Sequence, residues 1–162
     1  MDASLRQLPL RVSAADGLAS SWTFDGVVRL AKLPRILSAC VAPDVATTLS
    51  VSLQLQRTPL RDELLTGRVI GALPLRCQRC LGICTWSFDL ELSLQLVYSE
   101  AQARSRQAVA EVYEVPEDGF LPLCEIVGEE VLLALPIAPR HPDGACRAPG
   151  GAAVGDAQAL IT

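Results

Sequence analysis

Residues 75–97, LRCQRCLGICTWSFDLELSLQLV, carry the clearest structural signal in this chain. In the second half of the stretch, apolar and polar residues alternate strictly, as in a strand that buries one face against a core. The first half places Cys77 and Cys80 two residues apart, with Gly82 following. We interpret this half as the tip of a hairpin whose turn the glycine relieves. The stretch therefore predicts a long strand entered through a pair of cysteines.

The residues before the hairpin tip predict further antiparallel strands. Residues 64–76 are mostly apolar and form the other arm of the hairpin, and Gly67 and Gly71 within them indicate bulges or tight curvature. Residues 47–56 alternate in the same way and predict a third strand. The other expectations are an edge strand at 5–12, a turn at 15–18, a strand at 21–28 broken by a turn at Asp25-Gly26, a surface loop at 98–111 and a short strand at 112–115.

Two segments show helical periodicity. Apolar residues recur at helical spacing over about 30–40, where Pro34 must lie in the first turn or kink the helix. Residues 122–135 predict a second helix, which begins near Pro122 and ends before Pro136. These elements together predict an α+β protein with a mainly antiparallel, strongly twisted or barrel-like sheet and two packed helices.

The length of 162 residues favours one main domain, which we place at residues 1–146. Residues 147–162 are rich in alanine and glycine and predict a flexible tail. The N-terminal sequence lacks a basic region followed by an apolar run, and no stretch is apolar enough for a membrane span. We therefore expect a cytoplasmic protein.

The six cysteines in such a compartment favour free thiols or metal ligands over a disulfide framework. A C-x-x-C pair at a hairpin tip can supply two of the four ligands of a zinc ion, so zinc is a candidate cofactor. The same pair also occurs in redox proteins, although here it leads into a strand and not into a helix. Cys40 and Cys124 lie in apolar helical patterns and are expected to pack as small apolar side chains.

The charges divide the chain into two parts, although its net charge is only −4. Residues 1–84 hold ten Arg or Lys against six Asp or Glu, whereas residues 85–136 hold two against ten. Such runs are commonly solvated faces, but they also suit a basic side that touches phosphate and an acidic side that touches a basic partner. The aromatic content of 4% argues against recognition of RNA by base stacking.

Two stretches in this order resemble the YceD family of large ribosomal RNA subunit accumulation proteins. The first enters the long strand and carries Leu75, Cys77, Arg79 and Cys80; the second is an acidic helix followed by a histidine and a cysteine. The matching positions of the second are Glu129, Glu130, Leu133, Ala134, Leu135, Pro136, His141 and Cys146. The resemblance covers about residues 60–146, with a fainter likeness at Thr23 to Gly26.

The resemblance implies a non-enzymatic factor that supports the synthesis, processing or stability of large-subunit ribosomal RNA. Its partners would be that RNA or a ribosome-assembly protein, and neither a membrane nor a small-molecule substrate is expected. It also implies His141 and Cys146 as the further zinc ligands beside Cys77 and Cys80, with Cys84 as a substitute. A thiol- or zinc-dependent redox protein stays open as the alternative.

The expected contact residues are charged and lie near these motifs. Arg76 and Arg79 flank the cysteine pair, and Arg140 precedes the histidine, so all three are candidates for phosphate contact. Glu129 and Glu130 lie on the predicted acidic helix and are candidates for contact with a basic partner.

Overall fold

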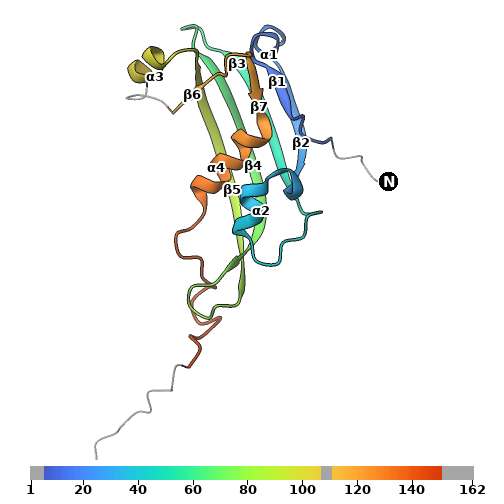
Figure 1. Cartoon of the computed structure of the whole chain (residues 1–162), viewed down its shortest axis with the longest axis vertical. Coiled ribbons are helices and arrows are strands. Elements are labelled where there is room, and N and C mark those ends of the chain that lie inside the picture. The colour runs from blue at the N-terminus through green and yellow to red at the C-terminus, as the bar shows by residue number, and fades with distance from the viewer. Residues whose placement is uncertain (1–5, 107–110, 151–162) are drawn as a thin grey trace, which may run out of the picture.

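The computed structural model describes residues 6–106 and 111–150, and it shows an α+β protein (Figure 1). Both predicted helices are present, the first as a 3₁₀ turn followed by a short α-helix with Pro34 at its start. In chain order the described elements are β1 (Arg11–Ser13), α1 (Ala14–Ser20), β2 (Thr23–Arg29), η1 (Leu30–Lys32), α2 (Pro34–Ala39), β3 (Thr48–Arg57), β4 (Glu63–Arg76), β5 (Ile83–Val97), α3 (Glu100–Arg106), β6 (Val112–Glu114), β7 (Phe120–Pro122) and α4 (Leu123–Ala134).

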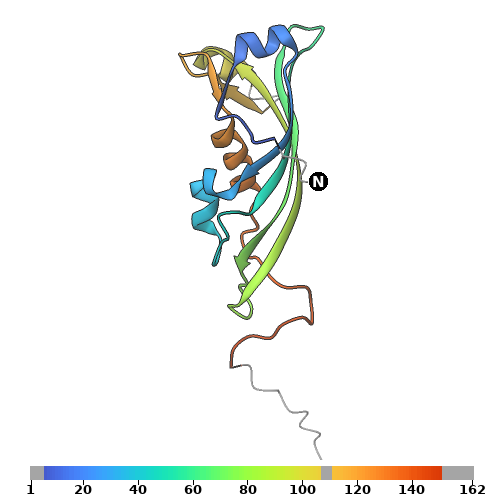
Figure 2. The ribbon, with the colours of Figure 1, turned by 90° about the vertical axis from the view of Figure 1, so that its right-hand side faces the viewer.

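The main sheet has the strand order β2-β3-β4-β5-β6. Its first four strands are antiparallel neighbours, and only the short β6 runs parallel to its neighbour β5. The described parts of β2 and β6 do not pair with each other, so the sheet is bent but does not close into a barrel, and the predicted twisted or barrel-like form is confirmed only in part (Figure 2). A separate two-stranded sheet joins β1 to β7.

The hairpin of β4 and β5 is the longest pairing in the sheet and runs from Arg76 opposite Ile83 to Leu64 opposite Gln95. Its register is continuous, so the predicted bulges at Gly67 and Gly71 are absent and the strands curve without them (Figure 2). The two glycines instead permit close approach. A Cβ on Gly67 would lie 2.2 Å from the Ser52 carbonyl oxygen, and one on Gly71 would lie 2.4 Å from a Leu49 methyl group.

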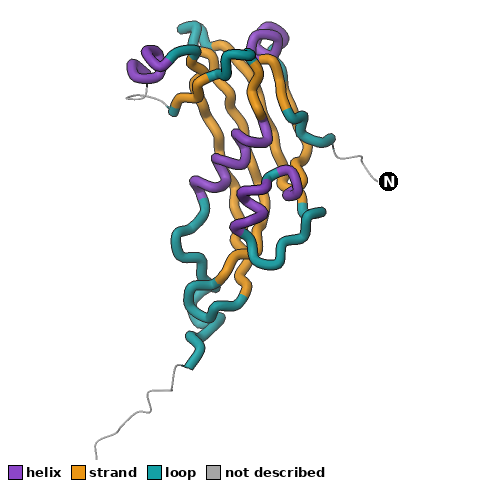
Figure 3. The backbone as a smooth tube through the Cα atoms, viewed as in Figure 1, coloured by secondary structure: helices purple, strands orange, loops and turns teal. Residues whose placement is uncertain are grey.

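The core lies between the concave face of the sheet and the helices α2 and α4 (Figures 2 and 3). Alternate residues of each long strand are buried on this face because the side chains of a strand point in turn to its two sides. Helix α4 buries the face predicted from its spacing, including Leu123, Ile126, Val127 and Val131. The other face of the sheet is polar, and there Arg68 pairs with Asp89 through both carboxylate oxygens.

Two predictions near the N-terminus differ from the structure. Strand β2 continues through Asp25 and Gly26, because the preceding segment pairs alongside it: the Val27 N–H donates to the Arg6 carbonyl at 2.8 Å. A Cβ on Gly26 would lie 2.1 Å from that same carbonyl oxygen, so the glycine serves close approach rather than a turn. The predicted edge strand at 5–12 is reduced to β1 and an isolated bridge between Gln7 and Val27.

Two helices were not predicted. Helix α1 replaces the expected turn; Ser13 caps its N-terminus by accepting from the Asp16 N–H, and Ala14, Gly17 and Leu18 are buried. Helix α3 occupies half of the expected loop at 98–111 and buries only Ala103. Of that loop, residues 107–110 lie outside the described residues, as do 151–162 of the predicted tail. Within the described ranges, none of the helices has the length and apolar character that crossing a membrane demands.

Candidate metal centre

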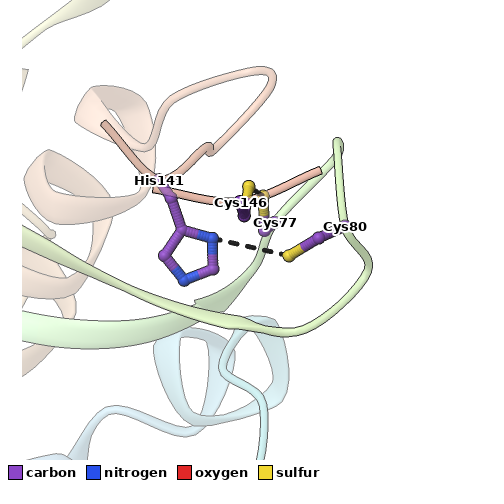
Figure 4. A group of neighbouring side chains, drawn as sticks. All are labelled: Cys77, Cys80, His141 and Cys146. Carbon is purple, nitrogen blue, oxygen red and sulfur yellow. Dashed lines mark hydrogen bonds between the residues drawn. The ribbon is translucent and has the colours of Figure 1, made fainter. Parts of the chain in front are cut away.

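The turn between β4 and β5 is held by its own backbone. The Cys77 N–H donates to the Gly82 carbonyl at 2.8 Å, and the Leu81 N–H donates to the Cys77 carbonyl at 2.9 Å. The left-handed residue of this turn is Leu81, with a φ of 62°, whereas the sequence suggested that Gly82 would relieve the turn. The result is a tight knuckle that directs the side chains of Cys77 and Cys80 to one side (Figure 4).

The chain that follows α4 returns to this knuckle (Figure 1). The Gln78 N–H donates to the Pro139 carbonyl at 2.8 Å, and the Arg79 guanidinium pairs with the Asp143 carboxylate at 2.9 Å. These two contacts place His141 and Cys146 beside the knuckle, more than sixty positions along the chain from its cysteines. The structure therefore brings together the four residues that the sequence suggested as metal ligands.

The potential ligand atoms of the four residues all lie within 4.8 Å of one another. The sulfur of Cys77 is 3.8 Å from that of Cys146, and the sulfur of Cys80 is 3.5 Å from Nδ1 of His141 (Figure 4). Tetrahedral zinc with ordinary bond lengths separates two sulfurs by about 3.8 Å and a sulfur from a nitrogen by about 3.6 Å. Both observed distances agree with the edges of such a tetrahedron.

The imidazole of His141 is oriented by a second contact. Its Nε2 lies 2.9 Å from the carbonyl oxygen of Ile83, the first residue of β5. A proton on Nε2 would donate to that carbonyl and leave Nδ1 as a lone-pair donor toward the cluster. A backbone carbonyl on the far nitrogen is the usual way in which a protein fixes a metal-binding histidine.

The two closest thiols have opposite pKa shifts. Burial opposes ionisation of Cys77, but hydrogen bonds from the backbone N–H groups of Cys80, His141 and Arg79 lower its pKa to about 5. The Arg79 N–H lies 3.4 Å from this sulfur. Burial and the neighbouring sulfurs of Cys80 and Cys77 raise the pKa of Cys146 to about 11. Without a cation, one thiolate is favoured at this pair; a divalent cation would favour both.

The four residues of the centre fit a zinc ion. Three sulfurs and one imidazole form one of the common structural zinc sets, and the backbone N–H near Cys77 and the carbonyl near His141 supply the outer contacts that such sites use. With four protein ligands, no position is left for water or substrate. When bound, zinc would cross-link the hairpin tip to the segment after α4.

The other three cysteines lie outside this group. Cys84 and Cys124 are buried and Cys40 is partly buried, and burial raises the pKa of each thiol. Cys124 packs in the core as predicted. Cys84 also belongs to the core and is not one of the four residues whose ligand atoms lie together.

The predicted contact residues lie in two places. Arg76 is exposed and donates to the Leu81 carbonyl at 3.2 Å, and Arg140 is exposed and precedes His141, so both lie near the knuckle. Arg79 is also there, but its guanidinium is engaged by Asp143. Glu129 and Glu130 lie on α4, where Glu129 pairs with Arg35 of α2.

The sequence reasoning missed Asp143 and Arg35. Asp143 lies in the stretch Pro142-Asp143-Gly144, which has the composition of an ordinary turn, and Arg35 is one of three cations that recur three residues apart at 29–35. Neither pairing had a signal in the sequence, because each depends on the tertiary path of a distant segment.

Fold and site together define an α+β protein in which a long hairpin ends in a cysteine–histidine centre closed by the segment after α4. The model of the family described as "Large ribosomal RNA subunit accumulation protein YceD" matches residues 65–159, and the chain belongs to this family. It is similar to the Large ribosomal RNA subunit accumulation protein YceD of Haemophilus influenzae, with 26% identity over 140 residues that cover 86% of this chain and 79% of the relative. No solved structure matches the chain.

Proposed function

We propose that this protein is a cytoplasmic, non-enzymatic factor of ribosome biogenesis that supports the accumulation of large-subunit ribosomal RNA by binding RNA or an assembly partner. Membership of the YceD family supports the role in ribosome biogenesis. The observation that carries the molecular part of the proposal is the four-ligand centre, because its closed ligand set suits a structural zinc and leaves no site for a reacting substrate.

Zinc has a structural role in this proposal. It holds the segment after α4 against the hairpin tip, and thereby keeps Arg140, which follows Pro139, near the knuckle that Arg76 flanks. Protein purified without oxygen is expected to contain about one zinc per chain. Cys77→Ser should lose the metal and melt at a lower temperature. The control Cys40→Ser, outside the centre, should keep the metal content and the melting temperature of the parent. Equal metal content in the two variants would contradict the assignment.

The arginines around the knuckle would supply the RNA contacts. Arg76 and Arg140 carry no carboxylate partner among the described residues, so their charges are available to phosphate, whereas Arg79 already neutralises Asp143. Such binding would be led by phosphate and would weaken steeply with salt.

The double variant R76Q/R140Q tests these contacts on a fragment of large-subunit ribosomal RNA. Its affinity should fall, and the slope of log K against log salt should become shallower by about two, since each lost phosphate contact removes about one. R11Q/R104Q changes the charge equally at the other end of the molecule, where β1 and α3 lie, and should bind as the parent does (Figure 1). Unchanged binding by R76Q/R140Q would refute the phosphate contacts.

A thiol redox protein is the second candidate. It is favoured by the lowered pKa of Cys77 and by the 3.8 Å that separates its sulfur from that of Cys146. This candidate predicts metal-free protein with a disulfide that exchanges rapidly with small thiols. Metal analysis and thiol titration on the same anaerobic sample separate the two candidates.

A further inference from the structure

The outer edge of β5 is open over most of its length. The strand spans Ile83–Val97, but β6 pairs only with its last three residues. The Gln95 N–H donates to the Glu111 carbonyl on this edge at 2.8 Å. Because alternate peptide groups of a strand point to the same side, the N–H groups of Ser93 and Glu91 face the same edge below β6. No backbone hydrogen bond from another described segment reaches them.

Three carboxylates along this edge form no salt bridge among the described residues, although Glu91 lies opposite Arg68 of β4 in the sheet register. Glu91 is exposed on β5, Glu111 precedes β6, and Glu130 lies on the side of α4 toward Glu111. In the described ranges no Lys or Arg lies within 4.0 Å of these three carboxylates. Burial and the neighbouring Glu111 raise the pKa of Glu130, as expected for an acid that lacks a compensating cation.

An apolar groove accompanies the acidic edge. It has a volume of about 530 Å³ and is lined by residues of α2, α4, β5 and β6. Leu94 and Tyr113 contribute from the sheet, and Leu133 contributes from α4 with 74% of its surface exposed. Just beyond α4, Ile137 is fully exposed. Exposed aliphatic side chains beside an unpaired strand edge are typical of a surface that pairs with another chain.

Charge decides which kind of chain suits this edge. If β5 paired antiparallel with β5 of a second copy, the acidic residues Asp89 and Glu91 of one strand would meet those of the other, and facing like charges destabilise a sheet. An added strand would meet Glu91 with its outer face, whereas its inner face would run beside the groove, where Glu111, Glu130 and the exposed Leu133 lie. Lysine or arginine on either face would therefore find the opposite charge.

We propose that the acidic open edge of β5 and the apolar groove beside it bind an extended, lysine- or arginine-rich segment of a partner protein. This segment adds a strand to the sheet below β6. Main-chain hydrogen bonds along the edge give this mode its affinity, and the alternate side chains give it specificity. The surface does not include Arg76 or Arg140, so it goes beyond the RNA contacts proposed above and can be tested separately from them.

The probe is a synthetic peptide of about ten residues, the length of a long strand, in which two lysines are followed by one valine so that both faces of the strand carry lysine. Its affinity for the full chain is measured by fluorescence anisotropy. E91Q/E130Q should weaken binding about tenfold, the effect of losing two partly exposed ion pairs. The control D25N/E117Q has the same charge change on residues outside the groove and should bind like the parent. Equal weakening in both variants would reduce the effect to net charge and overturn the proposal.

The strand mode has its own controls. A peptide with the same sequence but N-methylated at alternate residues keeps its charges and loses the edge hydrogen bonds, so it should not bind. S93P removes an N–H on the open edge without removing a bond to β4, and should abolish binding while the circular dichroism spectrum is retained. Binding of the methylated peptide, or of S93P at parental affinity, would overturn strand addition.

Two other occupants would appear in the same experiments. Sedimentation of the chain alone would reveal a dimer that S93P dissociates if a second copy covers the edge. An RNA oligonucleotide that displaces the peptide from the parent and from R76Q/R140Q equally would place nucleic acid on this surface. Either outcome would contradict the proposal that a basic segment of a partner protein occupies this edge.

Discussion

At the scale of single residues, Glu130 shows a side chain whose burial costs stability. Burial and Glu111 raise the pKa of its carboxyl, so the folded protein holds this proton more tightly than the unfolded chain does. The resulting stabilisation is present below the unfolded pKa and is lost as pH rises through the higher folded pKa. E130Q should therefore melt at a higher temperature than the parent at pH 7, with the difference disappearing toward pH 4.

The measurement is a series of thermal melts of both proteins between pH 4 and pH 8. E117Q removes an exposed carboxylate of a turn and should show no comparable dependence on pH. A pH-independent gain in E130Q would mean that packing of the amide, and not the charge, is responsible.

The candidate site could be predicted only in part at this scale. The spacing of Cys77 and Cys80 and the alternation after them indicate a cysteine hairpin, since both are local. His141 and Cys146 entered through family resemblance, because no spacing rule connects them to a knuckle more than sixty residues away. The ion pair that Asp143 makes with Arg79 had no signal at all, since surface pairings of this kind depend on the folded path.

At the scale of elements, local periodicity separates what was predictable from what was not. The strands β3, β4 and β5 and the helix α4 have long apolar patterns and were predicted almost to their ends. Helix α1 has a turn-like sequence, and its burial of Ala14, Gly17 and Leu18 becomes favourable only where tertiary packing offers a surface. Helix α3 has a polar sequence with a single buried residue, so periodicity does not reveal it.

The two faces of β4 provide a paired test of the hairpin. Leu73 is fully buried on the concave face, whereas Ile70 is 43% exposed on the other face. Leu73→Ala should lower the free energy of unfolding by about 2–5 kcal/mol, and Ile70→Ala by less than about 1 kcal/mol. Urea denaturation measures both. Similar losses in the two variants would mean that the outer face of the sheet is also covered.

At the scale of the whole molecule, we propose that residues 1–146 form one domain and that the rest is a tail. A chain that stops at Gly150 should keep the melting temperature and zinc content of the full chain. One that stops at Pro142 lacks Asp143 and Cys146, so it should lose metal and stability together. A large loss of stability in the chain that stops at Gly150 would mean that the tail is part of the domain.

A zinc ion at the centre would also close a ring of chain, because Cys77 and Cys146 are separated by 69 positions. The ring contains β5, α3, β6, β7 and α4, whereas β1, β2 and β3 lie outside it. The β4–β5 hairpin is a local structure and can form early in folding, but the ring closes only when α4 and the segment after it are in place. An interaction that forms after the folding transition state slows unfolding and leaves the folding rate almost unchanged. Zinc would then determine the lifetime of the folded protein rather than the speed at which it forms.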